Sequence, residues 1–225
     1  MIKPYYERGN ITIYNCDCRE VLPKLPMVDL CLTDPPYGIG LGTKQRCKNM
    51  SKHGNDGYTI FEDNPEYISS VCVPTINLCR TKAKHTLLTP GIRNLFMYDN
   101  PDALWCLYWS AGAGIGKWKS FTCWQPLLCY GEPPNKPGCY PDTFIITEQA
   151  ESNGHPCPKP LQLWKKIIER MGTIETILDP FCGSGTTLVA AKQLGRACIG
   201  VEISEAYCEI AAKRLSQEVI PYEYD

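Results

Sequence analysis

The tetrapeptide Asp34-Pro35-Pro36-Tyr37 contains the residue types needed to hold a planar ligand that carries an amino group. It directly follows the apolar run 28–33, so it lies where a buried strand would meet a loop. The prolines fix the backbone and remove amide donors, which leaves carbonyl groups and the Asp34 carboxylate as acceptors. Tyr37 adds a flat apolar ring with a polar tip. A nucleobase with an exocyclic amine would fit this arrangement, and a strand that ends in a proline-rich turn is the plainer alternative.

A second cluster places an acid, an aromatic residue and glycines between a strand candidate and a helical pattern. The run 175–178 is followed by Asp-Pro-Phe-Cys-Gly-Ser-Gly and then by a helical pattern over 186–194. Gly183 and Gly185 let the backbone approach a ligand, and the helix N-terminus offers amide donors. Glu202 follows the next apolar run, where an acid binds ribose hydroxyls in nucleotide-binding folds. The turn is neither G-x-G-x-x-G nor a P-loop, which favours a nucleoside ligand without a pyrophosphate.

Together the two clusters resemble the DNA amino-methyltransferases, which transfer a methyl group from S-adenosylmethionine to an exocyclic nitrogen of adenine or cytosine. The likeness is to their permuted beta order, in which the Asp-Pro-Pro-Tyr half precedes the Phe-x-Gly-x-Gly half. Residues 155–160 match the His-Pro-x-x-Lys-Pro segment, which precedes a helix lining the methionine end of the cofactor. The run 11–17 ends in Asp17 and matches the adenine-contacting Gly-Asp, with Cys16 in the place of the glycine. The matched segments extend from residue 11 to residue 216.

The resemblance implies a direct transfer to a base extruded from the duplex and stacked on Tyr37. Asp34 and the Pro35 carbonyl would accept the amine hydrogens, without a cysteine nucleophile, and Cys182 is interpreted as a packing residue. The implied catalytic residues are Asp34, Pro35, Pro36 and Tyr37. The implied cofactor-binding residues are Asp17, His155, Lys159, Asp179, Phe181, Gly183, Ser184, Gly185, Thr186 and Glu202.

The choice of base rests on the first residue of the tetrapeptide. Family members with aspartate there mostly methylate adenine N6, and those with serine mostly methylate cytosine N4, so Asp34 favours adenine. Both bases present an amine beside a ring nitrogen, and cytosine therefore stays open. A catalytically idle nucleic-acid-binding regulator with the same fold is the alternative from another class. The filled positions of the expected site argue against it.

Composition indicates a compact enzyme. With 225 residues and 44% hydrophobic content, the chain can bury one core, so we expect a single domain over 1–225. The sequence shows no secretory signal and no membrane span, which predicts a cytoplasmic protein whose 14 cysteines are reduced. Cysteine and histidine spacings complete no zinc site, so no metal is expected. Because the net charge is only -1, DNA must meet a local basic patch, for which Lys44, Arg46, Lys48 and Lys52 are the candidates.

The elements that must position these residues alternate between strand and helix. Strands are predicted near 11–14, 28–33, 86–89, 104–109, 126–130, 175–178 and 197–201, and helices near 65–80, 160–171, 186–194 and 204–216. This order predicts a doubly wound α/β sheet. The resemblance implies the mostly parallel, seven-stranded Rossmann-like class I methyltransferase fold, circularly permuted, in which 177–179 lies beside 28–33.

Two segments are predicted to be loops that contact DNA, 38–57 and 131–153. The first is glycine-rich and basic, and a solvated insertion is its alternative interpretation. The second occupies the place where the family often carries its target-recognition region. A homodimer and a cognate restriction nuclease stay open as further partners.

Overall fold

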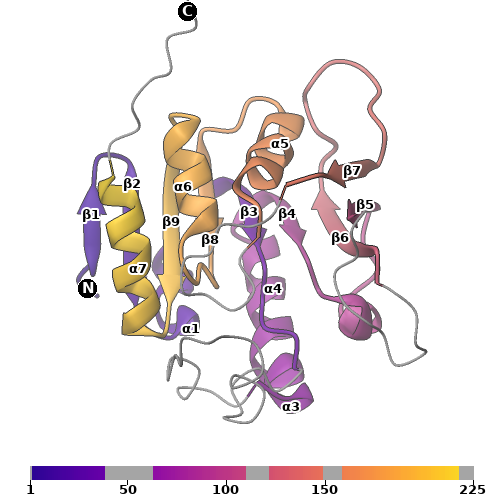
Figure 1. Ribbon diagram of the computed structural model, residues 1–225. Coiled ribbons are helices and arrows are strands. Elements are labelled where there is room, and N and C mark those ends of the chain that lie inside the picture. Colours follow the sequence, from indigo (N-terminus) through magenta and orange to yellow (C-terminus); the bar gives the residue numbers. More distant parts are fainter. Residues whose placement is uncertain (1, 39–62, 110–121, 149–158, 218–225) are drawn as a thin grey trace, which may run out of the picture.

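The computed structural model describes residues 2–38, 63–109, 122–148 and 159–217 (Figure 1). Within these ranges the strands form one nine-stranded sheet in the order β1-β2-β9-β8-β3-β4-β6-β5-β7. Their bounds are β1 Tyr6–Arg8, β2 Ile11–Asn15, β3 Val28–Thr33, β4 Ala83–Leu88, β5 Ala103–Trp109, β6 Trp124–Gly131, β7 Thr143–Ile146, β8 Thr176–Asp179 and β9 Ala197–Glu202. Across the described ranges, the helices are all too short or too polar to cross a lipid bilayer.

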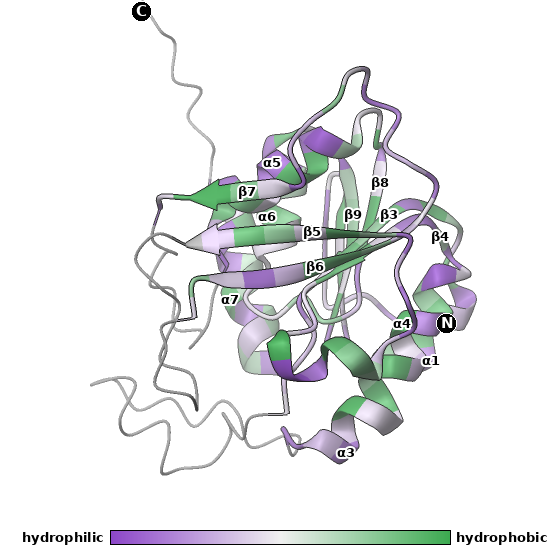
Figure 2. Ribbon diagram, turned by 90° about the vertical axis from the view of Figure 1, so that its right-hand side faces the viewer, coloured by the Kyte–Doolittle hydropathy of each residue, from purple (hydrophilic) through white to green (hydrophobic). Residues whose placement is uncertain are grey.

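Helices cover both faces of the sheet (Figure 2). One face carries α5 (Leu161–Met171), α6 (Thr186–Gln193) and α7 (Glu205–Ser216), and the other carries α1 (Cys18–Val21) and α4 (Val73–Arg80). The described ranges also contain four short helical elements, namely η1 (Leu22–Lys24), α3 (Pro65–Tyr67), the π-helical η2 (Ile68–Cys72) and η3 (Ile92–Met97). The helical stretch expected at 65–80 is continuous but widens into a π turn just before Pro74, which has no amide hydrogen to donate.

The central strands bury apolar side chains on both sides, because both faces of the sheet are covered by helices. In β3, Leu30 and Leu32 pack with the α5–α7 side, whereas Val28 and Cys31 pack with the α1 and α4 side. β8 alternates in the same way. Strand β3 pairs in parallel with both β8 and β4, so the predicted neighbourhood of 177–179 and 28–33 is confirmed.

The predicted strands and helices are all present, with bounds shifted by a few residues, and the α/β class is confirmed. The strand number was too low, because β1 and β7 were not predicted. β1 has only three residues, two of which are charged, and it pairs antiparallel with β2. β7 lies inside the segment 131–153 that was predicted to be a loop, and its four residues pair in parallel with β5. That loop prediction is therefore wrong at 143–146.

Candidate active site

The acidic residues singled out in the sequence gather at one edge of the sheet. Strands β3, β8 and β9 are neighbouring and parallel, and Asp34, Asp179 and Glu202 stand at or just after their carboxyl ends. The Thr33 hydroxyl donates to Asp179 Oδ1 at 2.6 Å, which ties the ends of β3 and β8 together. The structure thus brings the proline-rich tetrapeptide and the glycine-rich turn to one place, where ligands bind in open α/β sheets.

The Asp34 carboxylate is held by side chains from three parts of the chain. The Tyr37 hydroxyl donates to Asp34 Oδ1 at 2.5 Å, because the proline turn brings the tetrapeptide back on itself. The Thr89 hydroxyl also donates to Oδ1, and the Lys159 ammonium forms an ion pair with Oδ2. Asp34 is therefore a fixed, charged acceptor beside the glycine-rich turn.

The Tyr37 side chain is held at its ring and at its hydroxyl. Gly91 has a φ of 71°, and a Cβ at this position would lie 3.2 Å from the ring, so its backbone packs directly against Tyr37. The Asn94 amide donates to the Tyr37 carbonyl at 3.0 Å and fixes the backbone. Burial and the charge of Asp34 raise the pKa of the Tyr37 hydroxyl, which therefore stays protonated and can donate.

Lys159 lies at the tetrapeptide. Its ammonium pairs with Asp34, donates to the Tyr37 hydroxyl at 3.0 Å and lies 5.2 Å from the Tyr37 ring centre. Burial lowers the pKa of Lys159, but the charges and hydrogen bonds of Asp34 and Tyr37 outweigh it and hold this pKa above its ordinary value. Lys159 also lines a cavity with Asp34, Asp179 and Phe181, so it belongs to both halves of the site.

The glycine-rich turn is built around the Glu202 carboxylate. The Gly183 amide donates to Oε2 at 2.9 Å, and the Ser204 amide donates to Oε1 at 2.8 Å. Gly183 and Gly185 have φ values of 49° and 81°, which bend the chain into the N-terminus of α6. The Phe181 amide donates to Asp179 Oδ1 at 3.1 Å. Backbone amides and two acids thus shape a cradle at the end of β8 and β9.

Comparison with known proteins identifies the group to which this chain belongs. The family described as DNA methylase, of the N6 and N4 type, matches residues 97–213, which is more than half of the chain. The type II methyltransferase M.HpaI of Haemophilus parainfluenzae is 40% identical over 219 residues, covering 85% of this chain and 69% of the relative. The chain belongs to this family of DNA methylases.

Other relatives match the methylase over almost its full length. The type II methyltransferase M2.LlaDCHI of Lactococcus lactis subsp. cremoris is 25% identical and covers 96% of this chain and 93% of the relative. Among solved structures, an M1.HpyAVI complex with SAM is 22% identical, with a TM-score of 0.65 and coverage of 91% and 99%. The cytosine-N4-specific PvuII methyltransferase is 18% identical, with a TM-score of 0.67 and coverage of 97% and 90%. The methylase therefore has the class I methyltransferase fold.

Two further polar side chains of the methylase, neither singled out from the sequence, hold the cradle in place. The Asn15 amide at the end of β2 donates to the carbonyls of Glu202 and Ile203 at 2.9 and 3.0 Å. Arg214 on α7 donates to the Ser184 carbonyl at 2.6 Å and contacts the Thr186 hydroxyl at 3.3 Å. A single polar residue at the end of a strand or helix forms no sequence pattern that would predict its contacts. The sequence indicated only that Arg214 falls in the last turn of a predicted helix.

The remaining predicted cofactor residues have different surroundings. Asp17 caps α1 by accepting from the Arg19 amide at 2.9 Å, and its carboxylate also forms an ion pair with the Arg19 side chain. In the parallel pairing of β2 with β9, Asn15 lies opposite Glu202. Asp17 follows Asn15 by two residues, so it lies at the same edge of the sheet as Glu202. His155 lies outside the described residues, as do Lys44, Arg46, Lys48 and Lys52.

Cys182 is a packing residue, as the sequence interpretation held. Its side chain is buried, and a Cβ at Gly200 would lie 2.9 Å from its sulfur. Burial raises the pKa of the Cys182 thiol well above its ordinary value, so the thiol stays protonated. Burial thus disfavours this sulfur as the nucleophile that carbon methylation of cytosine would need.

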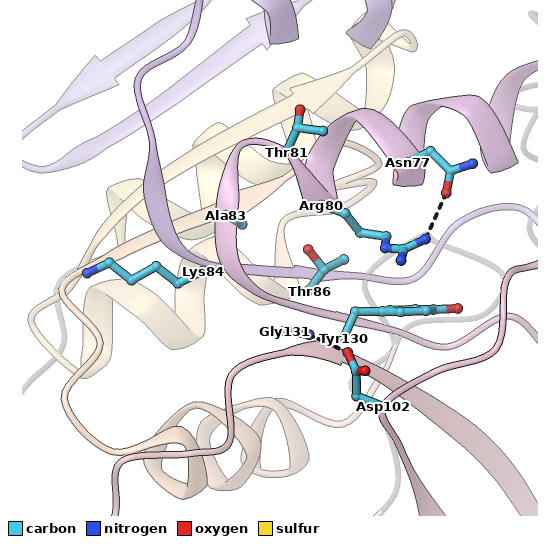
Figure 3. A pocket seen from close by; sticks show the side chains of 9 residues that line it. All are labelled: Asn77, Arg80, Thr81, Ala83, Lys84, Thr86, Asp102, Tyr130 and Gly131. Atoms are coloured by element: carbon cyan, nitrogen blue, oxygen red, sulfur yellow. Dashed lines mark hydrogen bonds between the residues drawn. The ribbon is translucent and has the colours of Figure 1, made fainter.

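A separate pocket of about 390 Å³ lies at the other end of the strands, where β4 begins and β6 ends (Figure 3). Its lining includes Arg80 and Lys84, whose charges are already paired with Asp99 at 2.5 Å and Asp29 at 2.7 Å. The Arg80 guanidinium also lies 4.5 Å from the Tyr130 ring centre. Because its cations are neutralised, this pocket is a weaker candidate than the edge that carries Asp34.

The methylase is expected to lose stability as pH rises from about 4.5 to about 7. Burial raises the pKa of Glu202 from 4.5 to about 7, and burial raises that of Asp179 to about 6. In this window the folded protein keeps a proton on Glu202 that the unfolded chain has lost, so the free energy of unfolding falls with pH, for Glu202 by roughly 3 kcal/mol at most. Urea unfolding of wild type and Glu202→Gln at pH 4.5 to 8 tests this. If the free energy of unfolding of Glu202→Gln fell as steeply with pH as that of wild type, a group other than Glu202 would cause the effect.

Proposed function

We propose that this methylase transfers a methyl group from S-adenosylmethionine to the N6 amine of an adenine extruded from DNA. S-adenosylmethionine is the methyl donor of its family. The observation that carries the proposal is the position of the Asp34 carboxylate, a fixed acceptor that shares one cavity with Phe181 and Gly183 of the glycine-rich turn. The acceptor for an amine and the cradle for a nucleoside are thus adjacent.

The residues present fit the cofactor. Glu202 offers a carboxylate for ribose hydroxyls, and Gly183 and Gly185 keep side chains out of the turn. Asp17 and Phe181 would contact the adenine end, whereas Asp179, Ser184, Thr186 and His155 would complete the set. Lys159, which was also expected to bind the cofactor, is paired with Asp34. When bound, the cofactor supplies an electrophilic methyl group on a sulfonium.

The chain's own contribution is orientation. The Asp34 carboxylate and the Pro35 carbonyl accept the hydrogens of the target amine and direct its lone pair at the methyl group. The new nitrogen–carbon bond forms as the sulfur–carbon bond breaks, and the surplus amine proton leaves to Asp34 or water. Pro36 keeps the turn rigid, and Tyr37 stacks on the extruded base, which offsets a few kcal/mol of unstacking. An aromatic amine is weakly nucleophilic, so placement supplies much of the acceleration.

Adenine is favoured by Asp34, since the aspartate-first motif is typical of N6 methylation, and N4-cytosine methylation is the second candidate. Both reactions would use the same residues. A regulator that only binds nucleic acid is disfavoured because Asp34, Tyr37 and Lys159 form a connected set of polar contacts beside the glycine-rich turn.

We propose that the segments 38–57 and 131–153 contact DNA. The basic residues of the first loop are the strongest candidates, and neutralising three of them should reduce the salt dependence of DNA binding by about one slope unit per lost phosphate contact.

We further propose a single catalytic unit over 1–225 that acts in the cytoplasm. A homodimer and a partner nuclease are proposals that light scattering and co-purification would test.

The decisive experiment is incorporation of tritiated methyl groups into duplex DNA, followed by digestion and chromatography of the nucleosides. We expect the label in N6-methyl-2′-deoxyadenosine. Label in N4-methylcytosine would replace adenine by cytosine and keep the mechanism. Absence of label with many DNA sequences, while S-adenosylmethionine and DNA both bind, would favour the regulator.

A further inference from the structure

We propose that Thr89 and Lys159 are positioning residues that leave Asp34 Oδ2 as the atom that accepts the target amine. This inference rests on the proposed function, because it concerns how the same carboxylate receives its substrate. Thr89 was not singled out from the sequence, and Lys159 was expected at the methionine end of the cofactor. Their contacts to Asp34 assign both a different role.

The number of donors around the carboxylate carries the first step. An ionised carboxylate has about four lone-pair positions. At Oδ1, the hydroxyls of Tyr37 and Thr89 both donate, so the two positions of this oxygen are occupied. At Oδ2, the Lys159 ammonium takes one position. With respect to the described residues, a single acceptor position remains, and it lies on Oδ2.

The second step is that each donor is fixed by a different part of the fold. Thr89 directly follows β4 and is fully buried, and its amide donates to the Thr33 carbonyl at 3.2 Å. The β3–β4 pairing therefore sets the place of its hydroxyl. Lys159 precedes α5, its side chain is only 9% exposed, and its ammonium also donates to the Tyr37 hydroxyl at 3.0 Å. The carboxylate cannot rotate without breaking contacts to separate elements.

Charge supports the same assignment. The cofactor sulfonium is a cation, so a second cation near it is unfavourable unless an anion compensates it. Lys159 is compensated by Asp34, with which it forms a neutral pair in a partly buried site. In this arrangement the lysine serves the carboxylate, and the cofactor is held by other groups. Loss of Lys159 should therefore affect the methyl-transfer step more than cofactor binding.

The test separates the rate of methyl transfer from cofactor affinity. Single-turnover methylation and calorimetric titration with S-adenosylmethionine are measured for Lys159→Met, Lys159→Arg, Thr89→Val and Thr89→Ser, with exposed Lys166→Met on α5 as the control. Lys159→Met is expected to lower the single-turnover rate of methyl transfer at saturating cofactor and DNA about 100-fold. The same variant should change the Kd for S-adenosylmethionine less than about threefold. Thr89→Val should slow methyl transfer about tenfold, and Thr89→Ser, which keeps the hydroxyl, should restore it.

Coupling between the two positions is the sharper readout. Because both residues act through one carboxylate, the double variant Thr89→Val/Lys159→Met should lose clearly less than the product of the single losses. Multiplicative losses would overturn the proposal, and so would a Lys159→Met variant with weakened cofactor binding and unchanged saturated rate. If Lys159→Met does not fold, Lys159→Arg decides, since it keeps the charge and should retain most of the rate. Failure of the proposed function looks different, because wild type itself would then leave no label in N6-methyl-2′-deoxyadenosine.

Discussion

Asp34→Ala is expected to abolish methyl transfer while S-adenosylmethionine still binds. The variant removes the carboxylate that would orient the amine, and losses of at least about 10²–10³-fold accompany removal of a comparable preorganised partner. It also leaves the Lys159 ammonium without its ion-pair partner, which is costly in a buried place. Asp34→Asn is therefore the better-matched variant. It keeps the shape of the side chain and one acceptor oxygen but removes the charge.

The measurement is tritiated methyl incorporation with a parallel calorimetric titration of the cofactor. Asp99→Ala is a suitable control, since it also breaks an ion pair, here with Arg80 at the separate pocket. We expect Asp99→Ala to retain activity and both Asp34 variants to lose it. Methylation at the wild-type rate in Asp34→Ala would refute the mechanism, and the proposed function would then need another acceptor for the amine.

Gly185→Ala is expected to reduce both stability and cofactor affinity. Gly185 has a left-handed backbone with φ 81° and ψ 28°, and an added Cβ would lie 2.8 Å from the Ala211 Cβ on α7. The left-handed conformation costs an alanine roughly 1–2 kcal/mol, and the forced separation of α6 from α7 adds about 1–3 kcal/mol. Because the same residue begins α6, the displaced turn should weaken S-adenosylmethionine binding more than tenfold.

Gly195→Ala provides the matched control for this effect. Gly195 also has a positive φ, 70°, but a Cβ there would meet nothing within 4 Å. It should therefore show the backbone cost alone, about 1–2 kcal/mol, with unchanged cofactor binding. Urea unfolding and calorimetry of both variants measure the difference. If Gly185→Ala and Gly195→Ala lost equal stability, α7 would have moved to accommodate the added methyl group without a further cost in free energy.

The sequence predicted the elements that are regular and the residues that form patterns. Strands β3 and β8 have apolar centres, Asp34 directly follows β3 and Glu202 ends β9, so the meeting of these acids at one edge could be expected from parallel topology. β7 was missed because four residues in a proline- and glycine-rich stretch give too short an alternation, and it forms only by pairing with β5.

The contacts of the site were less predictable than its location. Thr89 is one threonine after a strand, and only the β3–β4 register shows that its hydroxyl reaches Asp34. Lys159 was found through a motif, but its partner depends on the path of the chain before α5. Hydrogen bonds across such separations depend on tertiary packing, which leaves no local periodicity in the sequence.

The adjacency of β3 and β8 also determines when the site can form during synthesis. Thr33 and Asp179 are bonded across 146 positions of the chain, and Asp29 accepts from the Thr176 amide over 147. A ribosome that has released the first half of the chain has therefore delivered β3, which precedes Asp34, with one side of the strand still unpaired. Contacts this far apart form late and slowly. A nascent chain thus remains unable to modify DNA until its last third has emerged and β8 has been inserted beside β3.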